Sequence, residues 1–287
     1  MAIERLTSAE EFLSRTHLLR SSDVFRTNIL GSVATAVADG ALSYDDYFWW
    51  VAIDRQGEVI GAAMRTAPHG MILSPMPNQA ISELARAVAI HDDEMPSVSG
   101  PVRVVKKFLE EYEMTASEGS GRKSNLTEEL LIYALEKLTM PEVTGDMAAA
   151  LADDFDLILE WYVNFRQDTG VFMPHPENSI QAGMKRDSYR FWVRSGQKVS
   201  LAGHAPLVQT STGSIVRIGP VYTPPEQRGN GYASAVTAAL SKELLDKGSK
   251  VMLYTDAKNP TSNSIYQKIG FKMIDQNALF TFSVENV

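Results

Sequence analysis

A glycine-rich stretch joins a strand-like segment to a helix-like segment in the last third of the chain. Residues 221–236 read VYTPPEQRGNGYASAV, and Arg228, Gly229 and Gly231 stand at the start of a predicted helix over 231–247. The first backbone N–H groups of a helix have no acceptor within the helix, and the helix dipole adds partial positive charge there. Glycines let this backbone approach a bulky anion, and the arginine adds a charge. The stretch is therefore a candidate phosphate cradle.

The residue types in this stretch exclude two common phosphate-binding loops. A P-loop requires a lysine directly after its last glycine, and Tyr232 stands there. A dinucleotide-binding fingerprint requires glycine or alanine where Ser234 stands. For this stretch taken alone, a glycine turn without a ligand remains the plain alternative.

A second stretch follows one helix and one strand later. Residues 254–271 read YTDAKNPTSNSIYQKIGF, which predicts the end of a strand, a loop, a short helix over 262–269 and a Gly-Phe pair. The two stretches together resemble the GNAT superfamily of acetyl-CoA-dependent N-acetyltransferases. The segment 228–233 matches the family's pyrophosphate loop, which reads Gln or Arg, two residues, Gly, one residue, then Gly or Ala. The downstream family pattern is matched by Asn259, Tyr266, Gly270 and Phe271.

The resemblance, which covers 214–275 closely and 141–287 more loosely, implies acetyl-CoA as the acetyl-donor cosubstrate. The cofactor-binding residues that it implies are Val221, Tyr222, Thr223, Arg228, Gly229, Asn230, Gly231, Tyr232, Ala233, Ser234, Asn259 and Asn263. Backbone N–H groups of the first three would face the acetyl carbonyl and the pantetheine arm. The Gly219-Pro220 pair marks a predicted bulge that separates two strands where pantetheine enters.

Tyr266 is the candidate catalytic residue, because a phenol near the sulfur can protonate the leaving thiolate. Plain alternatives stay open: a packed helix tyrosine for Tyr266, core strand residues for Val221 and Tyr222, and a loop cap for Asn263. The general base is undecided. His204 is a candidate, although a surface hairpin histidine is the favoured reading.

Composition limits the classes of function. The 287 residues carry a net charge of −8 and include no cysteine, which excludes disulfides, thiol catalysis and Cys-ligated zinc. The net negative charge argues against nucleic acids and anionic membranes as partners. No metal is expected, because His91 and the acids at 92–94 read as a solvated helix end. The N-terminus lacks a signal-peptide pattern, and no apolar run is long enough to span a membrane. We expect a cytoplasmic monomer or homodimer.

The predicted elements run through a similar order twice. The first set has a helix over 7–19, strands over 46–52, 59–65 and 71–74, helices over 80–90 and 102–113, and a strand over 130–138. The second has helices over 146–166 and 179–185, strands over 189–193, 199–203 and 214–222, the helix 231–247, a strand over 251–255, the helix 262–269 and a strand over 279–284. This order predicts an α/β (α+β) fold class with two GNAT-like domains, each a mixed, mostly antiparallel sheet flanked by helices.

The predicted domains are a degenerate GNAT-like domain over 1–140 and a GNAT domain with the acetyl-CoA site over 141–287. Where the first pyrophosphate loop should lie, residues 75–80 read PMPNQA and lack the arginine and both glycines. The first domain is expected to complete the acceptor pocket or an oligomer interface. Its aromatic run 47–50 is a candidate lining, with core packing favoured.

The implied function is direct transfer of an acetyl group from acetyl-CoA to a primary amine of a small-molecule or peptide acceptor. Two alternatives remain. One is a non-catalytic module that binds CoA or acyl-CoA. The other is a transferase of a different acyl or aminoacyl group.

Overall fold

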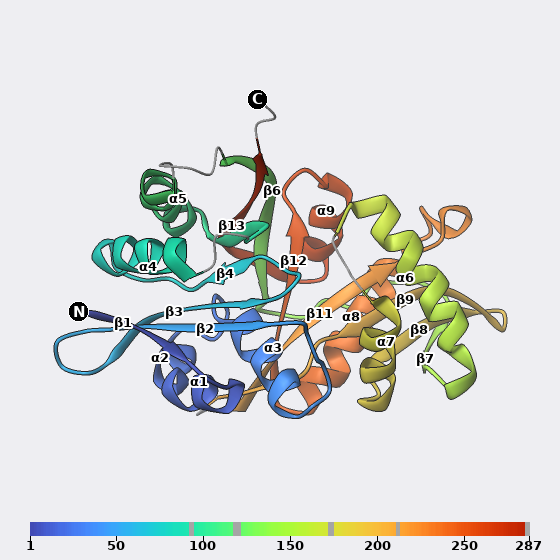
Figure 1. Ribbon diagram of the computed structural model, residues 1–287. Helices are drawn as coiled ribbons and strands as arrows, with labels where there is room; N and C mark the ends of the chain where they lie inside the picture. The colour runs from blue at the N-terminus through green and yellow to red at the C-terminus, as the bar shows by residue number, and fades with distance from the viewer. Residues whose placement is uncertain (92–94, 117–121, 172–174, 211–212, 285–287) are drawn as a thin grey trace. The chain divides into compact units, whose positions relative to one another are not determined.

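The chain forms two compact units. The computed structural model describes residues 1–91, 95–116, 122–171, 175–210 and 213–284. The first unit holds residues 1–132, 256–258 and the segment that begins at Asp275; the second holds 133–255 and 259–274 (Figure 1). Strands β6 (Arg122–Leu135) and β13 (Phe271–Val284) each contribute residues to both units. The predicted division at residue 140 stays a prediction.

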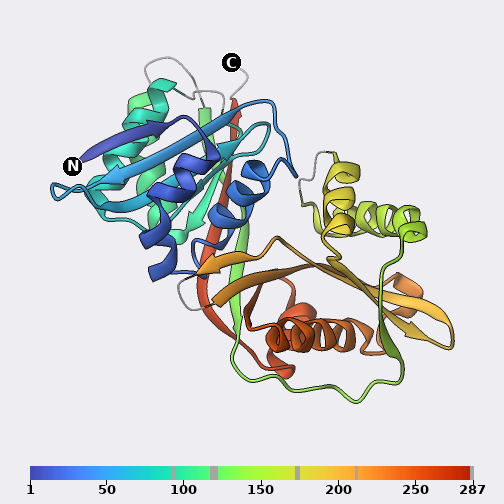
Figure 2. The same ribbon diagram turned by 90° about the horizontal axis from the view of Figure 1, so that it is seen from below.

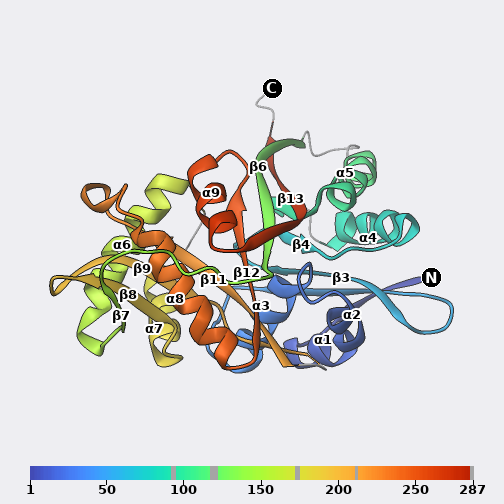
Figure 3. The ribbon, with the colours of Figure 1, turned by 180° about the vertical axis from the view of Figure 1, so that it is seen from behind.

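The first unit is built on a mixed, mostly antiparallel sheet with the strand order β1-β2-β3-β4-β5-β13. The strands are β1 (Ala2–Leu6), β2 (Tyr47–Ile53), β3 (Val59–Thr66), β4 (Met71–Leu73), β5 (Ser97–Pro101) and part of β13. All neighbours are antiparallel except the pair β4–β5. Helices α1 (Ala9–Arg15), α2 (His17–Ser22) and α3 (Asn28–Ala38) cover one face, and α4 (Asn78–His91) and α5 (Val102–Ala116) cover the other (Figures 1 and 3).

Strand β2 explains the aromatic run of the first unit. Trp49 and Val51 belong to the apolar core under α1 and α3, whereas Phe48 and Trp50 belong to the core under α4 and α5. Because successive side chains of a strand point to opposite faces, a strand covered by helices on both sides is apolar throughout. These aromatic side chains therefore pack in cores.

The second unit repeats this architecture around the strand order β12-β11-β9-β8-β7, with β10 paired to β11. Its strands are β7 (Asp146–Ala149), β8 (Tyr189–Arg194), β9 (Gln197–His204), β10 (Val208–Thr210), β11 (Gly213–Tyr222) and β12 (Ser249–Asp256). Only β11–β12 is parallel among the pairs whose register is described. Helices α6 (Phe155–Thr169) and α7 (Pro176–Lys185) cover one face of this sheet, and α8 (Tyr232–Asp246) covers the other (Figure 2).

The two units share one order of elements. The first reads β2-β3-β4-α4-β5-α5, and the second reads β8-β9-β11-α8-β12 followed by α9 (Pro260–Lys268). In each unit a helix connects the two parallel strands: α4 connects β4 to β5, and α8 connects β11 to β12. The predicted fold class is confirmed: the chain is mixed α/β, with mostly antiparallel strand pairing flanked by helices. None of the described helices is long and apolar enough to cross a bilayer.

One predicted helix is wrong at its start. Residues 146–149 form strand β7, and α6 begins at Phe155 after a short 3-10 turn. Asp146 to Ala149 pair with β8, and Asp154 accepts a hydrogen bond from the Leu151 amide at 2.9 Å. The alanine-rich sequence favours a helix locally, but pairing to the sheet edge overrides this propensity. Elements β1, α3 and β5 were not predicted, because they are short or carry no clear helix cap.

A buried ion pair joins α8 to the sheet of the second unit. Arg190, on β8, donates to both carboxylate oxygens of Glu243 at 2.8 and 2.7 Å, and also to Asp187. Its side chain is only 6% exposed. The hydrogen bonds from Arg190 lower the pKa of Glu243 to about 2. Because the folded-state pKa lies below the unfolded value, this contribution to stability is present above about pH 4.5 and is lost as the pH falls towards 2.

We expect Glu243→Gln to lower the free energy of unfolding by about 2 kcal/mol at pH 7, because it removes one of the two carboxylates that balance a buried guanidinium and leaves only Asp187, whose side chain is more exposed. The difference from wild type should shrink between pH 4.5 and pH 3 in urea titrations. Lys242→Gln is the matched control, since it breaks the exposed Lys242–Asp246 pair on the same helix and should change stability by less than about 0.5 kcal/mol. Equal effects of the two variants would contradict the role of the buried pair.

Candidate active site

Strands β11 and β12 separate halfway along their length. Their parallel pairing runs from Ser214 opposite Ser249 to Ile218 opposite Leu253, yet β11 continues to Tyr222 and β12 continues to Asp256. The register of β11 with β9 also shifts between Ile218 and Val221. Gly219 and Pro220 stand at this shift, and proline has no N–H to donate to a ladder. The predicted bulge is confirmed, and it leaves the edge of β11 after Ile218 open on the side of β12.

The glycine-rich stretch carries the chain from the open edge into α8. Gly229 and Gly231 have φ values of 79° and 78°, which non-glycine residues rarely adopt. A Cβ on Gly231 would also lie 3.0 Å from the Val143 Cγ2 atom. Gly231 is the N-cap of α8, and no described side chain caps the helix there. The first N–H groups of α8 are therefore available to an anion.

Arg228 and Asn230 fold the loop in front of this helix start. The Arg228 Nε donates to the Thr223 carbonyl at 3.0 Å, and its Nη2 pairs with Asp168 at 2.6 Å. The Asn230 amide donates to the carbonyls of Gln227 and Arg228 at 3.0 and 3.2 Å. The Arg228–Asp168 pair is about half exposed, so it holds the guanidinium only weakly. Arg228 can therefore turn to an incoming phosphate.

The side chains of Tyr222 and Tyr232 are structural. Tyr222 is buried in the core under α6 and α7, and the Arg228 guanidinium lies 5.9 Å from its ring centre. Tyr232 is buried at the first turn of α8, where its hydroxyl accepts a hydrogen bond from Arg194 at 2.7 Å. Ala233 and Ser234 follow in the same turn and are partly buried. The open edge and the helix start thus belong to one contiguous segment, 219–234.

Three further predicted residues lie at the start of α9 or along it. Asn259 is the N-cap, and its side-chain oxygen accepts from the Ser262 amide at 3.0 Å. The backbone amide of Asn263 donates to the Asn259 carbonyl at 3.1 Å within the same turn. Tyr266 is buried, and its ring lies 6.1 Å from that of Phe271. Burial raises the pKa of Tyr266 to about 12, so its phenol stays protonated at neutral pH.

His204 lies beside the bulge, because it pairs with Ile218, the last residue of β11 before the register shift. Burial lowers the pKa of His204, which favours the neutral imidazole. Its Nδ1 lies 2.8 Å from the Ala205 carbonyl oxygen, which assigns the proton to Nδ1 and leaves Nε2 as an acceptor. The histidine is therefore partly enclosed, in contrast to the surface position that the sequence favoured.

Sequence reasoning missed Ser200, which supports the site, and two buried polar side chains of the second unit, Arg186 and Ser188. Ser200 is buried and bridges the Tyr222 carbonyl at 3.0 Å and the Thr223 hydroxyl at 2.8 Å, which fixes the end of β11. Arg186 has two buried guanidinium nitrogens, and Ser188 a buried hydroxyl, without a hydrogen-bond partner among the described residues. A short sequence motif around the glycine loop cannot predict side chains that lie far from it in the sequence. The acids at 92–94 lie outside the described residues.

Comparison with known proteins agrees with this geometry. Residues 196–280 match the family model described as FR47-like protein. A mycothiol acetyltransferase of Pseudarthrobacter chlorophenolicus is 34% identical over 128 residues, and one of Paenarthrobacter aurescens is 38% identical over 127 residues. Each match covers 39% of this chain and 39% of the relative, so the chain spans about two fifths of the length of these curated relatives.

Solved structures match the fold along the whole chain. A GNAT-family acetyltransferase from Colwellia psychrerythraea has a TM-score of 0.59 at 14% identity and covers 99% of this chain and 100% of its own. A tandem GNAT protein from the clavulanic acid biosynthesis pathway has a TM-score of 0.59 at 11% identity, with 100% and 99% covered. At these identities the likeness concerns the fold. The chain therefore has the fold of these GNAT-family structures.

Proposed function

We propose that the second unit is an acetyl-CoA-dependent N-acetyltransferase. The observation that carries this proposal is the open edge of β11 after Ile218, which leads through Gly229 and Gly231 to the uncapped start of α8. An extended amide-containing arm can add backbone-like hydrogen bonds to an open strand edge. A pyrophosphate fits a helix start with free N–H groups. The spacing of these two features in one segment suits a CoA thioester.

The proposed cofactor seat uses backbone groups more than side chains. Val221, Tyr222 and Thr223 offer the open strand edge to the acetyl carbonyl and the pantetheine arm. Residues 228–234 form the proposed pyrophosphate cradle, because positive φ values there need glycine and the ion pair of Arg228 with Asp168 is exposed and can be exchanged. Asn259 and Asn263 stand at the start of α9 as further contacts for the arm.

The proposed reaction is a direct transfer. The amine nitrogen of the acceptor attacks the thioester carbonyl carbon, a C–N bond forms, the C–S bond breaks, and the sulfur takes a proton. Tyr266 is the proposed donor of that proton, since its raised pKa keeps the phenol protonated. A backbone N–H of the open edge would stabilise the oxyanion. His204 stays a candidate for the base that accepts the amine proton.

The acceptor is proposed to be a small molecule or a peptide with a primary amine. The relatives named mycothiol acetyltransferase favour a small-molecule acceptor and make amines that carry a thiol worth including in a panel. Release of CoA, followed chromatographically across such a panel, tests the function. Binding of acetyl-CoA without turnover of any amine would favour the alternative of a non-catalytic binding module. Faster turnover of longer acyl-CoA or of aminoacyl donors would favour the other alternative.

Placing bulk in the cradle should weaken acetyl-CoA binding. Gly231→Val is expected to raise the dissociation constant at least about tenfold, because a branched side chain disfavours the positive φ by roughly 1–3 kcal/mol and meets Val143. Gly248→Val is the matched control, since Gly248 also has a positive φ of 80° but lies after the far end of α8 with open space around it. Calorimetry that shows wild-type affinity for Gly231→Val would contradict the cradle.

Removing the phenol hydroxyl should slow turnover without weakening the binding of acetyl-CoA. Tyr266→Phe is expected to lower kcat and kcat/KM together by about 10²-fold, as for a group that acts in the transition state. Tyr133→Phe is the control, because Tyr133 is also buried and accepts a hydrogen bond from Gln267 on the same helix at 3.1 Å. Unchanged kcat for Tyr266→Phe between pH 6 and pH 10 would leave Tyr266 as a packing residue.

One acetyl-CoA should bind per chain. The counterpart of the cradle in the first unit is 75–80, where Pro75 and Pro77 have no N–H to donate and Met76 is buried in the core. Calorimetric titration of the whole chain is expected to give a stoichiometry of one, and Gly231→Val should remove that site. Two equivalent sites, or one that survives Gly231→Val unchanged, would show that the first unit keeps a cofactor site.

A further inference from the structure

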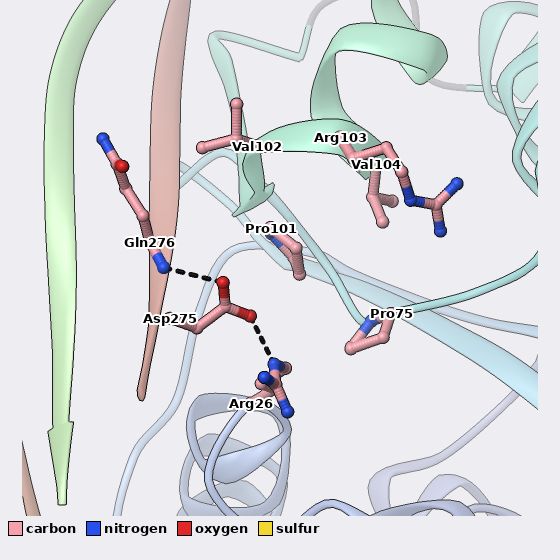
Figure 4. A pocket seen from close by; sticks show the side chains of 8 residues that line it. All are labelled: Arg26, Pro75, Pro101, Val102, Arg103, Val104, Asp275 and Gln276. Carbon is pink, nitrogen blue, oxygen red and sulfur yellow. Dashed lines mark hydrogen bonds and ion pairs between the residues drawn. The ribbon is translucent and has the colours of Figure 1, made fainter. Parts of the chain in front are cut away.

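The first unit contains a cavity at the carboxyl ends of its parallel strands. It has a volume of about 540 Å³ and is lined by Pro75, which follows β4, and by Pro101, which ends β5 (Figure 4). Strands β4 and β5 pair only at Met71–Val98 and Ile72–Ser99 in the described register. Crevices outside the carboxyl ends of neighbouring parallel strands are common ligand sites in α/β sheets. By element order, this place corresponds to the proposed cofactor cleft of the second unit.

The walls and the size of the cavity suit a small organic molecule. Pro75, Pro101, Val102 and Val104 give it an apolar lining, and Val104 is fully buried behind them. A volume of about 540 Å³ falls within the range of roughly 300–1,000 Å³ that is typical of small-molecule pockets. The cavity is therefore large enough for a metabolite-sized ligand with an apolar body.

Two arginines line the cavity, and they differ in how their charge is balanced. Arg26 forms ion pairs with Asp275, which also lines the cavity, and with Asp23 at 3.0 Å. Figure 4 shows Arg26 and Asp275 pointing toward one another, with the two prolines between this pair and Arg103. Two carboxylates thus surround this one guanidinium and leave a net negative charge, so Arg26 is not available to an anionic ligand.

Arg103 carries an unbalanced charge. Its Nη2 donates to the Met76 carbonyl at 3.0 Å and its Nη1 donates to the Asn78 side-chain oxygen, and both acceptors are neutral. Arg103 forms no ion pair with any residue that the structure describes. Asn78 is the first residue of α4, so the positive end of that helix dipole lies beside the guanidinium. Of the two cavity arginines, Arg103 is thus the one whose guanidinium has no carboxylate partner among the described residues.

We propose that the cavity of the first unit binds a small organic anion, with a carboxylate on Arg103 and an apolar body against Pro75, Pro101 and Val104. The carboxylate would balance both the guanidinium and the α4 dipole, and an arginine offers two parallel N–H groups to such a group. Acetyl-CoA does not suit this place, because the segment before α4 contains no glycine and because Pro75 and Pro77 have no backbone N–H group to donate. The site goes beyond the proposed acetyl transfer and does not depend on it.

Benzoate and benzamide test this site, because they have the same apolar body and differ in charge. In ligand-observed NMR titrations of the full chain, benzoate is expected to bind and benzamide to bind at least about tenfold more weakly. Arg103→Gln should weaken benzoate binding at least about tenfold. Arg86→Gln is the matched control, since Arg86 is an exposed arginine of α4 paired with Glu111, and it should leave benzoate binding unchanged.

Asn78→Asp gives a second variant that preserves the fold. It places a carboxylate on the existing partner of Arg103 at the start of α4, where a negative charge stabilises a helix. We expect it to weaken benzoate binding as Arg103→Gln does while leaving thermal stability equal or higher. Binding of benzoate should persist in Gly231→Val, which separates this site from the proposed cofactor cradle. Equal binding of benzamide, unchanged binding in both variants, or no benzoate binding at millimolar concentration would each overturn the proposal.

Discussion

The arrangement of the second unit depends on one interruption of backbone pairing. Strands β11 and β12 form five paired positions and then stop pairing at Ile218 and Leu253, although both strands continue. Gly219 and Pro220 break the ladder, since one allows an unusual backbone angle and the other lacks an N–H. An open strand edge inside a sheet leaves polar backbone groups without partners, which is unfavourable unless water or a ligand supplies them. The interruption therefore leaves backbone groups of β11 that water or another polar group has to satisfy.

The two units show how the same frame can carry different chemistry. In both units a strand leads into a helix, and the strand that follows the helix pairs in parallel with the strand before it. In the second unit the helix starts at a glycine in the left-handed region, with no side-chain cap. In the first unit the helix starts at Asn78, whose side chain is bonded to Arg103. The frame is set by apolar faces, as in β2, whereas the polar groups available at the helix start are set by the few residues there.

The sequence predicted the second unit better than the first for a physical reason. The glycines at 229 and 231 and the prolines act locally, so their effect on the backbone can be predicted from short segments. Strand β7 was read as a helix, because its pairing with β8 depends on a contact that local sequence does not carry. The support of Thr223 by Ser200, and the pairing of Arg228 with Asp168, also join residues far apart in the chain. Such contacts are decided by the fold.

Helix α8 has opposite requirements at its two ends. Its N-terminus must leave backbone N–H groups free, which gives up the stabilisation of a side-chain cap, typically about 1 kcal/mol. Its C-terminal half is fixed by Glu243 to Arg190, an ion pair that is largely buried on the side of β8. A helix held firmly at one end keeps its other end in place without a cap. The exposed Arg228–Asp168 pair can then open and close at little cost, because the position of the helix does not depend on it. Rigid placement and an exchangeable charge are thus divided between the C-terminal half of α8 and the loop before its N-terminus.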